Sequence, residues 1–396
     1  MSFGVICAGF FIFSTFGLTE TVRAGEPLPV SIAEIVKPCL GDGKATGIVV
    51  GIVTPRGEEY YGFGRARRES REKPDEKTLF EIGSISKLFT NLLLEDEALK
   101  NRIHMDDPVT QYLPPGCPFP KPAKSAWTGF RDDPGRHQVT LWQLATHTSG
   151  FPEIPGEGDL PAGYNPKEPA NVTLEMGREF LRKFTFSWEP GTHYEYSSIN
   201  IALLGYVLSL REKQEVETLI RSRILDPLGM GDTRITLSPG QAERLAEGYS
   251  SDGKPASFIG TSMDFAAGGS FKSTAADLVK FAAYSLGLRT PNPLAPAMAE
   301  QQRLLDRLSG GPSRSISYFL YPHEFGNILS VRARTMGFRG CLALVPSRKL
   351  GVVILTNWND LNIQPVMEKV ARWAVGKMEA KTAGESRKTR RAANHG

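Results

Sequence analysis

Residues 340–356 read GCLALVPSRKLGVVILT, and this stretch decides how the two ends of the chain fold. Two apolar runs flank a Pro-Ser-Arg-Lys turn, which is the pattern of a β-hairpin. Near the other end of the chain, residues 46–53 (TGIVVGIV) predict a strand, and residues 59–64 predict a returning strand after a Pro-Arg-Gly turn. We therefore expect one antiparallel sheet built from N- and C-terminal strands.

Between these strands the pattern is mainly helical. A helix should begin near Ser84, because apolar residues then recur at helical spacing. Further helices are predicted at 141–147, 200–210, 215–225, 274–286 and 364–378. This order indicates an α+β protein, with helices flanking the sheet and a central, mainly helical lobe. The α/β lobe would span about 40–84 and 265–376, the helical lobe about 85–264, and a site would lie at their seam.

Composition and charge narrow the class of partner. The chain has 396 residues, 40% of them hydrophobic and 23% charged, which is enough apolar material for a packed core. Its net charge of +4 is carried by residues 377–396, which hold six basic and two acidic side chains. This tail lacks apolar runs, so we expect it to be disordered. The neutral body argues against a nucleic-acid partner.

The first residues resemble a secretory signal. The apolar run 5–17 is too short to span a bilayer but fits the central region of a signal peptide, with Val22-Arg23-Ala24 as a cleavage site. No Lys or Arg precedes the run, which leaves an uncleaved anchor or a misassigned start as alternatives. We expect residues 1–24 to be a signal peptide, residues 25–376 the folded domain, and the protein to be exported to the periplasm or beyond, without a stable membrane span.

Several familiar chemistries lack their motif. The six histidines form no HExxH pair, and the cysteines left after signal removal are three, without a CxxC. There is no GxGxxG, GxxxxGK[ST] or GxSxG. We therefore predict no metal and no cofactor.

Ser-x-x-Lys occurs three times, beginning at Ser70, Ser84 and Ser251. The first lies in a charged run and the third in a turn, whereas Ser84 opens an apolar helix. There the amine of Lys87 would sit beside the hydroxyl, one helical turn away. Burial would lower the pKa of Lys87, so that the amine can activate the hydroxyl as a nucleophile. The spacing alone fits equally a helix N-cap serine followed by a surface lysine.

A second clue is PGTHYEYSS at 190–198, which runs into the helix predicted from Asn200. A tyrosine just before a helix start can point its phenol into a cleft. A nearby lysine ammonium would lower the pKa of Tyr196, whose phenolate would then serve as general base. The alternative is an amphipathic tyrosine with Ser197 or Ser198 as the helix N-cap.

Seven segments, in order and at sensible intervals, resemble the serine β-lactamase-related family, which includes class C β-lactamases, penicillin-binding DD-carboxypeptidases, D-aminopeptidases and esterases. They are FEIGSISKLFT (80–90), MDDPVTQYLP (105–114), VTLWQLATHTSGFP (139–152), PGTHYEYSSINIALLGYVL (190–208), ILDPLGMGDT (224–233), AAGGSFKSTAADLVKF (266–281) and ALVPSRKLGVVILTN (343–357). The resemblance implies a β-lactamase/transpeptidase-like fold.

It also implies roles for individual residues. Ser84 would be the acylated nucleophile, Lys87 its proton partner and Tyr196 the general base. The backbone N–H of Ser84 and one N–H from the strand after the third motif would form the oxyanion hole. His147 looks like a packing and turn element rather than a catalytic group.

The chain departs from the family pattern in two places. The family's Tyr-Ser-Asn is Tyr196-Ser197-Ser198, so a shorter side chain would orient the substrate. The third motif, Lys/His-Thr/Ser-Gly, falls on 331–333, where Val-Arg-Ala supplies neither the cation nor the glycine. Arg332 or Arg334 could replace the charge, or a shifted loop could bring 334–336 to the site. We therefore name Ser198, Arg332 and Arg334 as substrate-binding candidates.

Three functions follow from this reading. The first is an exported serine hydrolase that forms an acyl-enzyme on Ser84 with a cell-wall peptide of the D-Ala type, a β-lactam or a small amide or ester. The second is a carboxylesterase-like relative that needs no substrate carboxylate, motivated by Val331. The third is a penicillin-binding-like pseudoenzyme that keeps the fold without turnover, motivated by both departures.

Overall fold

The structure is a computed structural model that describes residues 31–43, 47–120, 138–154, 173–257, 263–305 and 312–393. The predicted signal peptide, residues 1–24, lies outside these ranges. Within them, every helix is too short or too polar to cross a membrane.

One antiparallel sheet joins the two ends of the chain, with the strand order β2-β1-β8-β7-β6-β5 in the described residues. The strands are β1 (Gly47–Thr54), β2 (Gly57–Gly64), β5 (Phe319–Tyr321), β6 (Ile328–Arg334), β7 (Arg339–Val345) and β8 (Leu350–Thr356). β7 and β8 pair up to Val345 opposite Leu350, so the predicted hairpin is confirmed. β8 also pairs with β1, which confirms the predicted α+β sheet of N- and C-terminal strands.

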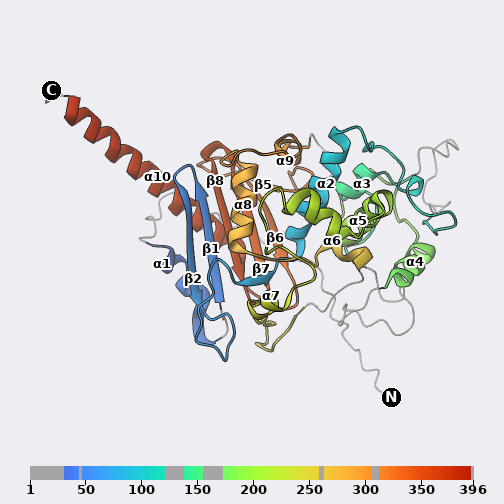
Figure 1. The fold of residues 1–396 in the computed structure, drawn as a ribbon, viewed down its shortest axis with the longest axis horizontal. Helices are drawn as coiled ribbons and strands as arrows, with labels where there is room; N and C mark the ends of the chain where they lie inside the picture. Colours follow the sequence, from blue (N-terminus) through green and yellow to red (C-terminus); the bar gives the residue numbers. More distant parts are fainter. Residues whose placement is uncertain are drawn as a thin grey trace, which may run out of the picture.

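Helices cover both faces of this sheet (Figure 1). α8 (Ala275–Ser285) packs on one face, against β1 and β8, and α10 (Ile363–Ala393) packs on the other with α1 (Ile32–Val36). Side chains of β1 alternate between the two layers: Val49 belongs to the core below α8 and Val50 to the core below α10. Because neither face meets water, β1 and β8 are continuous apolar runs rather than alternating ones.

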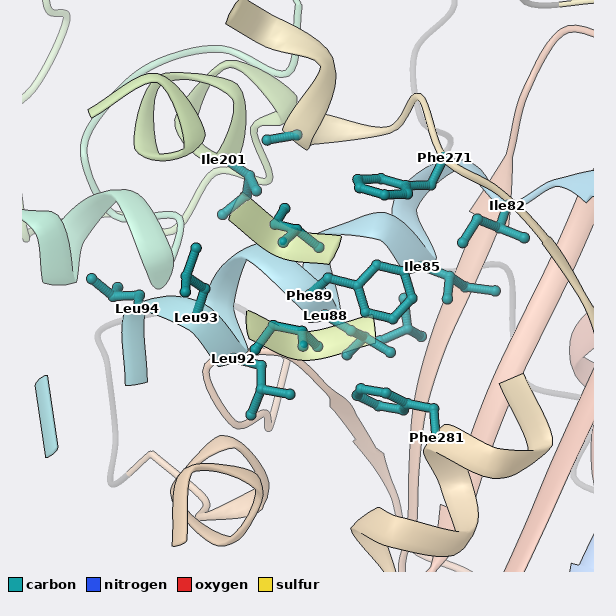
Figure 2. Packing of buried hydrophobic residues seen from close by; sticks show 14 of the residues in the cluster. Ile82, Ile85, Leu88, Phe89, Leu92, Leu93, Leu94, Ile201, Phe271 and Phe281 are labelled. Carbon is teal, nitrogen blue, oxygen red and sulfur yellow. The ribbon is translucent and has the colours of Figure 1, made fainter. Parts of the chain in front are cut away.

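The rest of the molecule is mainly helical and lies beside the sheet (Figure 1). Its helices are α2 (Lys87–Leu99), α3 (Leu141–Ala145), α4 (Leu174–Lys183), α5 (Ser198–Glu212), α6 (Val216–Ile220) and α7 (Pro239–Glu243), and α9 (Ala295–Gln302) packs against α2. α2 is buried from Lys87 to Glu97, and the ring centroid of Phe89 lies 5.6 Å from that of Phe271 and 5.5 Å from that of Phe281 (Figure 2). Such aromatic packing fixes α2 against the segment before α8 and α8 itself.

The sequence patterns did not reveal a second, small sheet. β3 (Leu79–Glu81) pairs antiparallel with β4 (Lys272–Thr274). Thr274 then caps α8, because its side chain accepts the N–H of Asp277, and the helix begins where the sequence predicts one. This pair of short strands fixes the chain immediately before Ser84.

The end of the chain differs from the expectation. A disordered tail was predicted for 377–396, but α10 continues as helix to Ala393 and extends beyond the body (Figure 1). The prediction was therefore wrong for the described part of the tail. The segment lacks proline and is rich in Ala, Lys, Arg and Glu, which are strong helix formers, so the helix begun on the sheet continues.

Candidate active site

Ser84 lies on η2 (Gly83–Ser86), one turn of 3₁₀ helix between β3 and α2. The residue before it, Gly83, has a φ of +40°, and a Cβ there would come within 3.0 Å of the carbonyl oxygen of Arg334. Glycine is therefore needed for both conformation and close approach. Ser84 therefore lies directly beside the end of β6.

Lys87, the first residue of α2, is buried with 6% of its surface exposed. Its Nζ lies 3.1 Å from the Ser84 Oγ, 3.2 Å from the Ser198 Oγ and 2.6 Å from the carbonyl oxygen of Gly268. Burial lowers the pKa of Lys87 to about 7, against a smaller opposing effect of the charge of Glu153. The surface-lysine alternative is thereby excluded, and the amine has a neutral fraction at neutral pH.

The phenol of Tyr196 completes the cluster. Its hydroxyl donates to the Ser84 Oγ over 2.7 Å, and its ring centroid lies 5.2 Å from the Lys87 Nζ. The expected fall in the pKa of Tyr196 is wrong, because burial raises that pKa and the hydrogen bond to Ser84 offsets only part of the rise. Tyr196 therefore holds its proton at neutral pH, and Lys87 is the group that can lose one.

The structure shows which of Ser197 and Ser198 caps the helix α5 and which lies at the site. Ser197 is the N-cap of α5, since its Oγ accepts the N–H of Asn200 over 3.1 Å. Ser198 is the first residue of that helix and directs its hydroxyl to the Lys87 amine. Of the predicted substrate-binding residues, Ser198 thus lies in the Ser84 cluster itself.

The segment 147–153 holds Tyr196 and Ser198 in place, a contact that sequence reasoning did not predict. His147 receives hydrogen bonds from the N–H groups on both sides of Tyr196. The carbonyl of Pro152 accepts from the Ser197 hydroxyl at 2.7 Å, and the carbonyl of Glu153 accepts the Ser198 N–H at 2.9 Å. Two segments about fifty residues apart in sequence are therefore joined along their length.

Glu153 is a site residue that the sequence analysis missed. Its pKa is raised by burial, while the positive charges of Lys87 and Arg334 act to lower it and Glu195 to raise it. The negative charge of Glu153 in turn raises the pKa of Lys87, so it influences when the amine loses its proton. The only sequence signal was its place directly after the Ser-Gly-Phe-Pro turn at 149–152.

The degenerate third motif forms the end of β6, next to Gly83. Val331 and Ala333 are buried in the core, 6% and 3% exposed, whereas Arg332 and Arg334 are exposed. Arg332 donates to Gln364 over 2.8 Å and stacks over the ring of Tyr321, so its side chain points to the start of α10. The register with β7 runs without interruption from Leu329 to Arg334, and Arg334 and Thr335 at its end lie against Gly83.

The outer edge of β6 is open beside the nucleophile. β5 pairs with β6 only over Ile328–Ser330, and beyond it no described strand pairs with this edge. Thr335 donates to Phe338 across the turn to β7, and hydrogen-bonded pairs alternate along an antiparallel ladder. The peptide groups of Arg332 and Arg334 therefore face the open edge and the Ser84 side.

Comparisons with known proteins agree with this fold. A family model described as Beta-lactamase matches residues 32–376. A beta-lactamase of Pseudomonas fluorescens is 26% identical over 363 residues, which are 84% of this chain and 94% of that protein. One of Escherichia coli (strain K12) is 24% identical over 381 residues, 87% of this chain and 92% of that protein.

Solved structures share the fold. A beta-lactamase/D-alanine carboxypeptidase from Pseudomonas syringae superimposes with a TM-score of 0.72 at 20% identity, covering 87% of this chain and 97% of that one. A class C beta lactamase from Rhodobacter sphaeroides gives a TM-score of 0.70 at 26% identity, covering 88% and 99%.

Proposed function

Since the chain belongs to the beta-lactamase family, we propose that it is an exported serine hydrolase that forms an acyl-enzyme on Ser84. Its substrate is a cell-wall peptide with a D-Ala-type end, a β-lactam, or a small amide or ester. The observation that carries this proposal is the convergence of the Ser84 hydroxyl with the Lys87 amine at 3.1 Å and the Tyr196 phenol at 2.7 Å. Export rests on the apolar run 5–17 alone.

The protonation states of Lys87 and Tyr196 suggest the order of the proton transfers during acylation. Neutral Lys87 takes the proton of the Ser84 hydroxyl as the oxygen attacks the carbonyl carbon. The bond to the leaving group breaks, and that group takes the phenolic proton of Tyr196, which Lys87 then restores. The Ser84 proton has thereby reached the leaving group, and the ester on Ser84 awaits hydrolysis by water through the reverse transfers. This order follows from a lowered pKa at Lys87 and a raised one at Tyr196.

The backbone at the end of β6 supplies the rest of the site. The N–H of Arg334 faces the open edge beside Ser84, so this N–H and that of Ser84 would bind the developing oxyanion. An extended acyl chain can pair with the same edge as an added strand. The exposed Arg334, at the end of this edge, would attract a substrate carboxylate, whereas Arg332 is directed to Gln364.

The burial of Val331 and Ala333 favours a second candidate function. No cation projects inward at the position of the third motif, so a substrate without a carboxylate would lose little binding. A carboxylesterase-like activity on neutral esters would meet this condition.

A labelling experiment tests the proposal. A fluorescent penicillin and a fluorophosphonate probe should label the wild type and spare Ser84→Ala. Ser251→Ala is the matched control, because it removes the serine of another Ser-x-x-Lys in an exposed turn and should label normally. Equal labelling of Ser84→Ala would refute the acyl-enzyme on Ser84.

The same experiment separates the candidates. Turnover of p-nitrophenyl esters without penicillin labelling would favour the esterase. Absence of both labelling and turnover would leave the pseudoenzyme.

A further inference from the structure

We propose that His147 is a positioning residue that holds the phenol of Tyr196 on the Ser84 hydroxyl, an inference that rests on the proposed role of Tyr196. Among the described residues, His147 makes no hydrogen bond to Ser84. It acts through the chain around Tyr196 and through the Tyr196 ring.

The backbone on both sides of Tyr196 is bound to this one residue. The N–H of Glu195 donates to the carbonyl oxygen of His147 over 2.9 Å. The N–H of Ser197 donates to the His147 Nδ1 over 3.1 Å. With both flanking amides fixed, the Cα of Tyr196 has little freedom to shift along or across the segment.

The imidazole ring also supports the phenol directly. Its centroid lies 4.7 Å from that of Tyr196 at an interplanar angle of 36°, and His147 is 8% exposed. The edge of Tyr194 closes another side of the imidazole, at 6.2 Å and 89°. The Tyr196 ring is therefore held on one face by His147, while its hydroxyl reaches Ser84.

His147 is itself held rigidly, in a backbone conformation that few side chains adopt. It follows α3 with a φ of +58°, its N–H donates to Leu144, and the next N–H, of Thr148, donates to Gln143. Among non-glycine residues such a φ is uncommon, and asparagine and histidine tolerate it better than most. This turn sends the ring back toward the segment before α5.

The imidazole of His147 must be neutral to accept the hydrogen bond from Ser197. For Nδ1 to accept the Ser197 N–H, the ring proton must reside on Nε2. Burial, together with the positive charges of Lys87 and Arg314, lowers the pKa of His147 to about 3. The imidazole thus stays neutral, and the acceptor is retained, across the pH range in which Lys87 titrates.

Four variants test the inference: His147→Gly, His147→Asn, Tyr196→Phe and the double variant His147→Gly/Tyr196→Phe. The measured quantity is the rate at which Ser84 is acylated by the fluorescent penicillin or a chromogenic anilide, because in both the leaving nitrogen must take a proton. Glycine accepts the positive φ but removes the ring, so we expect labelling to slow by about 10–100-fold. Asparagine accepts the same φ and carries Oδ1 near the position of Nδ1, so it should recover most of the rate.

The double variant separates positioning from general stability. If His147 acts through the phenol, His147→Gly should have less than about a twofold effect once Tyr196 is phenylalanine. An equal loss in both backgrounds, or an Asn variant as slow as the Gly variant, would overturn the inference. A Tyr196→Phe variant with the wild-type rate would instead refute the proposed role of Tyr196 itself.

Folding is controlled separately. Should His147→Gly unfold below the assay temperature, His147→Leu replaces it, since leucine resembles asparagine in shape but offers no acceptor. The inference then requires the Asn variant to be faster than the Leu variant at equal thermal midpoints. Equal rates would contradict it.

Discussion

The hydroxyl of Tyr196 donates to the Ser84 Oγ over 2.7 Å, although 112 positions separate the two residues in the sequence. One comes from the turn before α2 and the other from the segment before α5. A buried tyrosine that keeps its proton next to a serine beside a lysine can pass a proton to a leaving group, but it is a poor base in the resting enzyme.

Tyr196→Phe should therefore slow the acylation of Ser84 by about 10²–10⁴-fold. The stacking on His147 is retained, so the thermal midpoint should change little. The rate of acylation by the fluorescent penicillin or a chromogenic anilide measures the effect, because their leaving nitrogen must take a proton. Tyr194→Phe is the control, because that ring stacks on Arg314 rather than contacting Ser84. An unchanged rate in Tyr196→Phe would remove the phenol from the mechanism.

The rate of acylation should rise with pH through about 7. The pKa of Lys87 is lowered to about 7, so below that pH the amine is an ammonium and cannot accept the Ser84 proton. The labelling rate of a probe without titratable groups, measured from pH 5 to 9, should rise in a single limb of the pH–rate curve whose midpoint lies near the pKa of Lys87. The limb should vanish in Lys87→Met, and a limb of the same midpoint in that variant would assign it to another group.

Glu153→Gln should move this limb to lower pH. The negative charge of Glu153 raises the pKa of Lys87, so its removal lets that pKa fall further. The backbone carbonyl that binds Ser198 is untouched by the change. Glu195→Gln is the control, since Glu195 acts on Glu153 and is not among the charges that shift Lys87. A limb displaced to higher pH in Glu153→Gln contradicts the assignment.

Lys87 should also leave a signature in the free energy of unfolding. Its pKa is about 7 in the folded chain, against an ordinary value of 10.5 for a lysine in water. Between these two pH values Lys87 is protonated in the unfolded chain and neutral in the folded chain, so the free energy of unfolding rises with pH there. Below pH 7 the amine is charged in both states, and the full cost of burying that charge lowers the stability. Relative to Lys87→Met, the wild type should gain up to about 1.4 kcal/mol per pH unit in this window.

Urea unfolding of both proteins at pH 7, 8 and 9 measures this difference. The variant serves as the reference for every other group that titrates in the window. A difference that does not change with pH would mean that Lys87 is charged in the folded protein.

The arginines of β6 should distinguish the substrate classes. Removing the charge by Arg334→Ala should raise KM about five- to tenfold for a substrate with a carboxylate, and Arg332→Ala, whose guanidinium binds Gln364, should raise it less. The matched neutral methyl ester should be unaffected, since the peptide groups of β6 remain. Equal effects on acid and ester would show that these side chains do not bind the carboxylate.

The sequence was sufficient for the sheet and the three central groups because these depend on local pattern. The hairpin of β7 and β8, the helix after Ser84 and the strand near residue 50 are each set by apolar periodicity. Ser84, Lys87 and Tyr196 stood out because their residue types and flanking patterns are distinctive. The family motifs then placed them together, which spacing alone could not.

What the sequence did not reveal depends on long-range packing. Glu153 and the carbonyl of Gly268 approach Lys87 only once α2, α5 and the segment before α8 have packed together. The pKa of Tyr196 was predicted in the wrong direction because the sequence shows a nearby cation but not the burial that outweighs it. The helical tail was missed because disorder was inferred from charge, while α10 is already nucleated on the sheet.

Ser84, Lys87 and Tyr196 come from two separate parts of the fold, and this affects how activity responds to heating. Ser84 and Lys87 are carried by η2 and α2, and Tyr196 by the segment that His147 clamps to the end of α3. A drift of one ångström between these two supports would break the phenol contact while leaving almost all apolar side chains covered. Turnover should consequently fail at a lower temperature than the one at which helical ellipticity is lost, so that activity reports on alignment before it reports on unfolding.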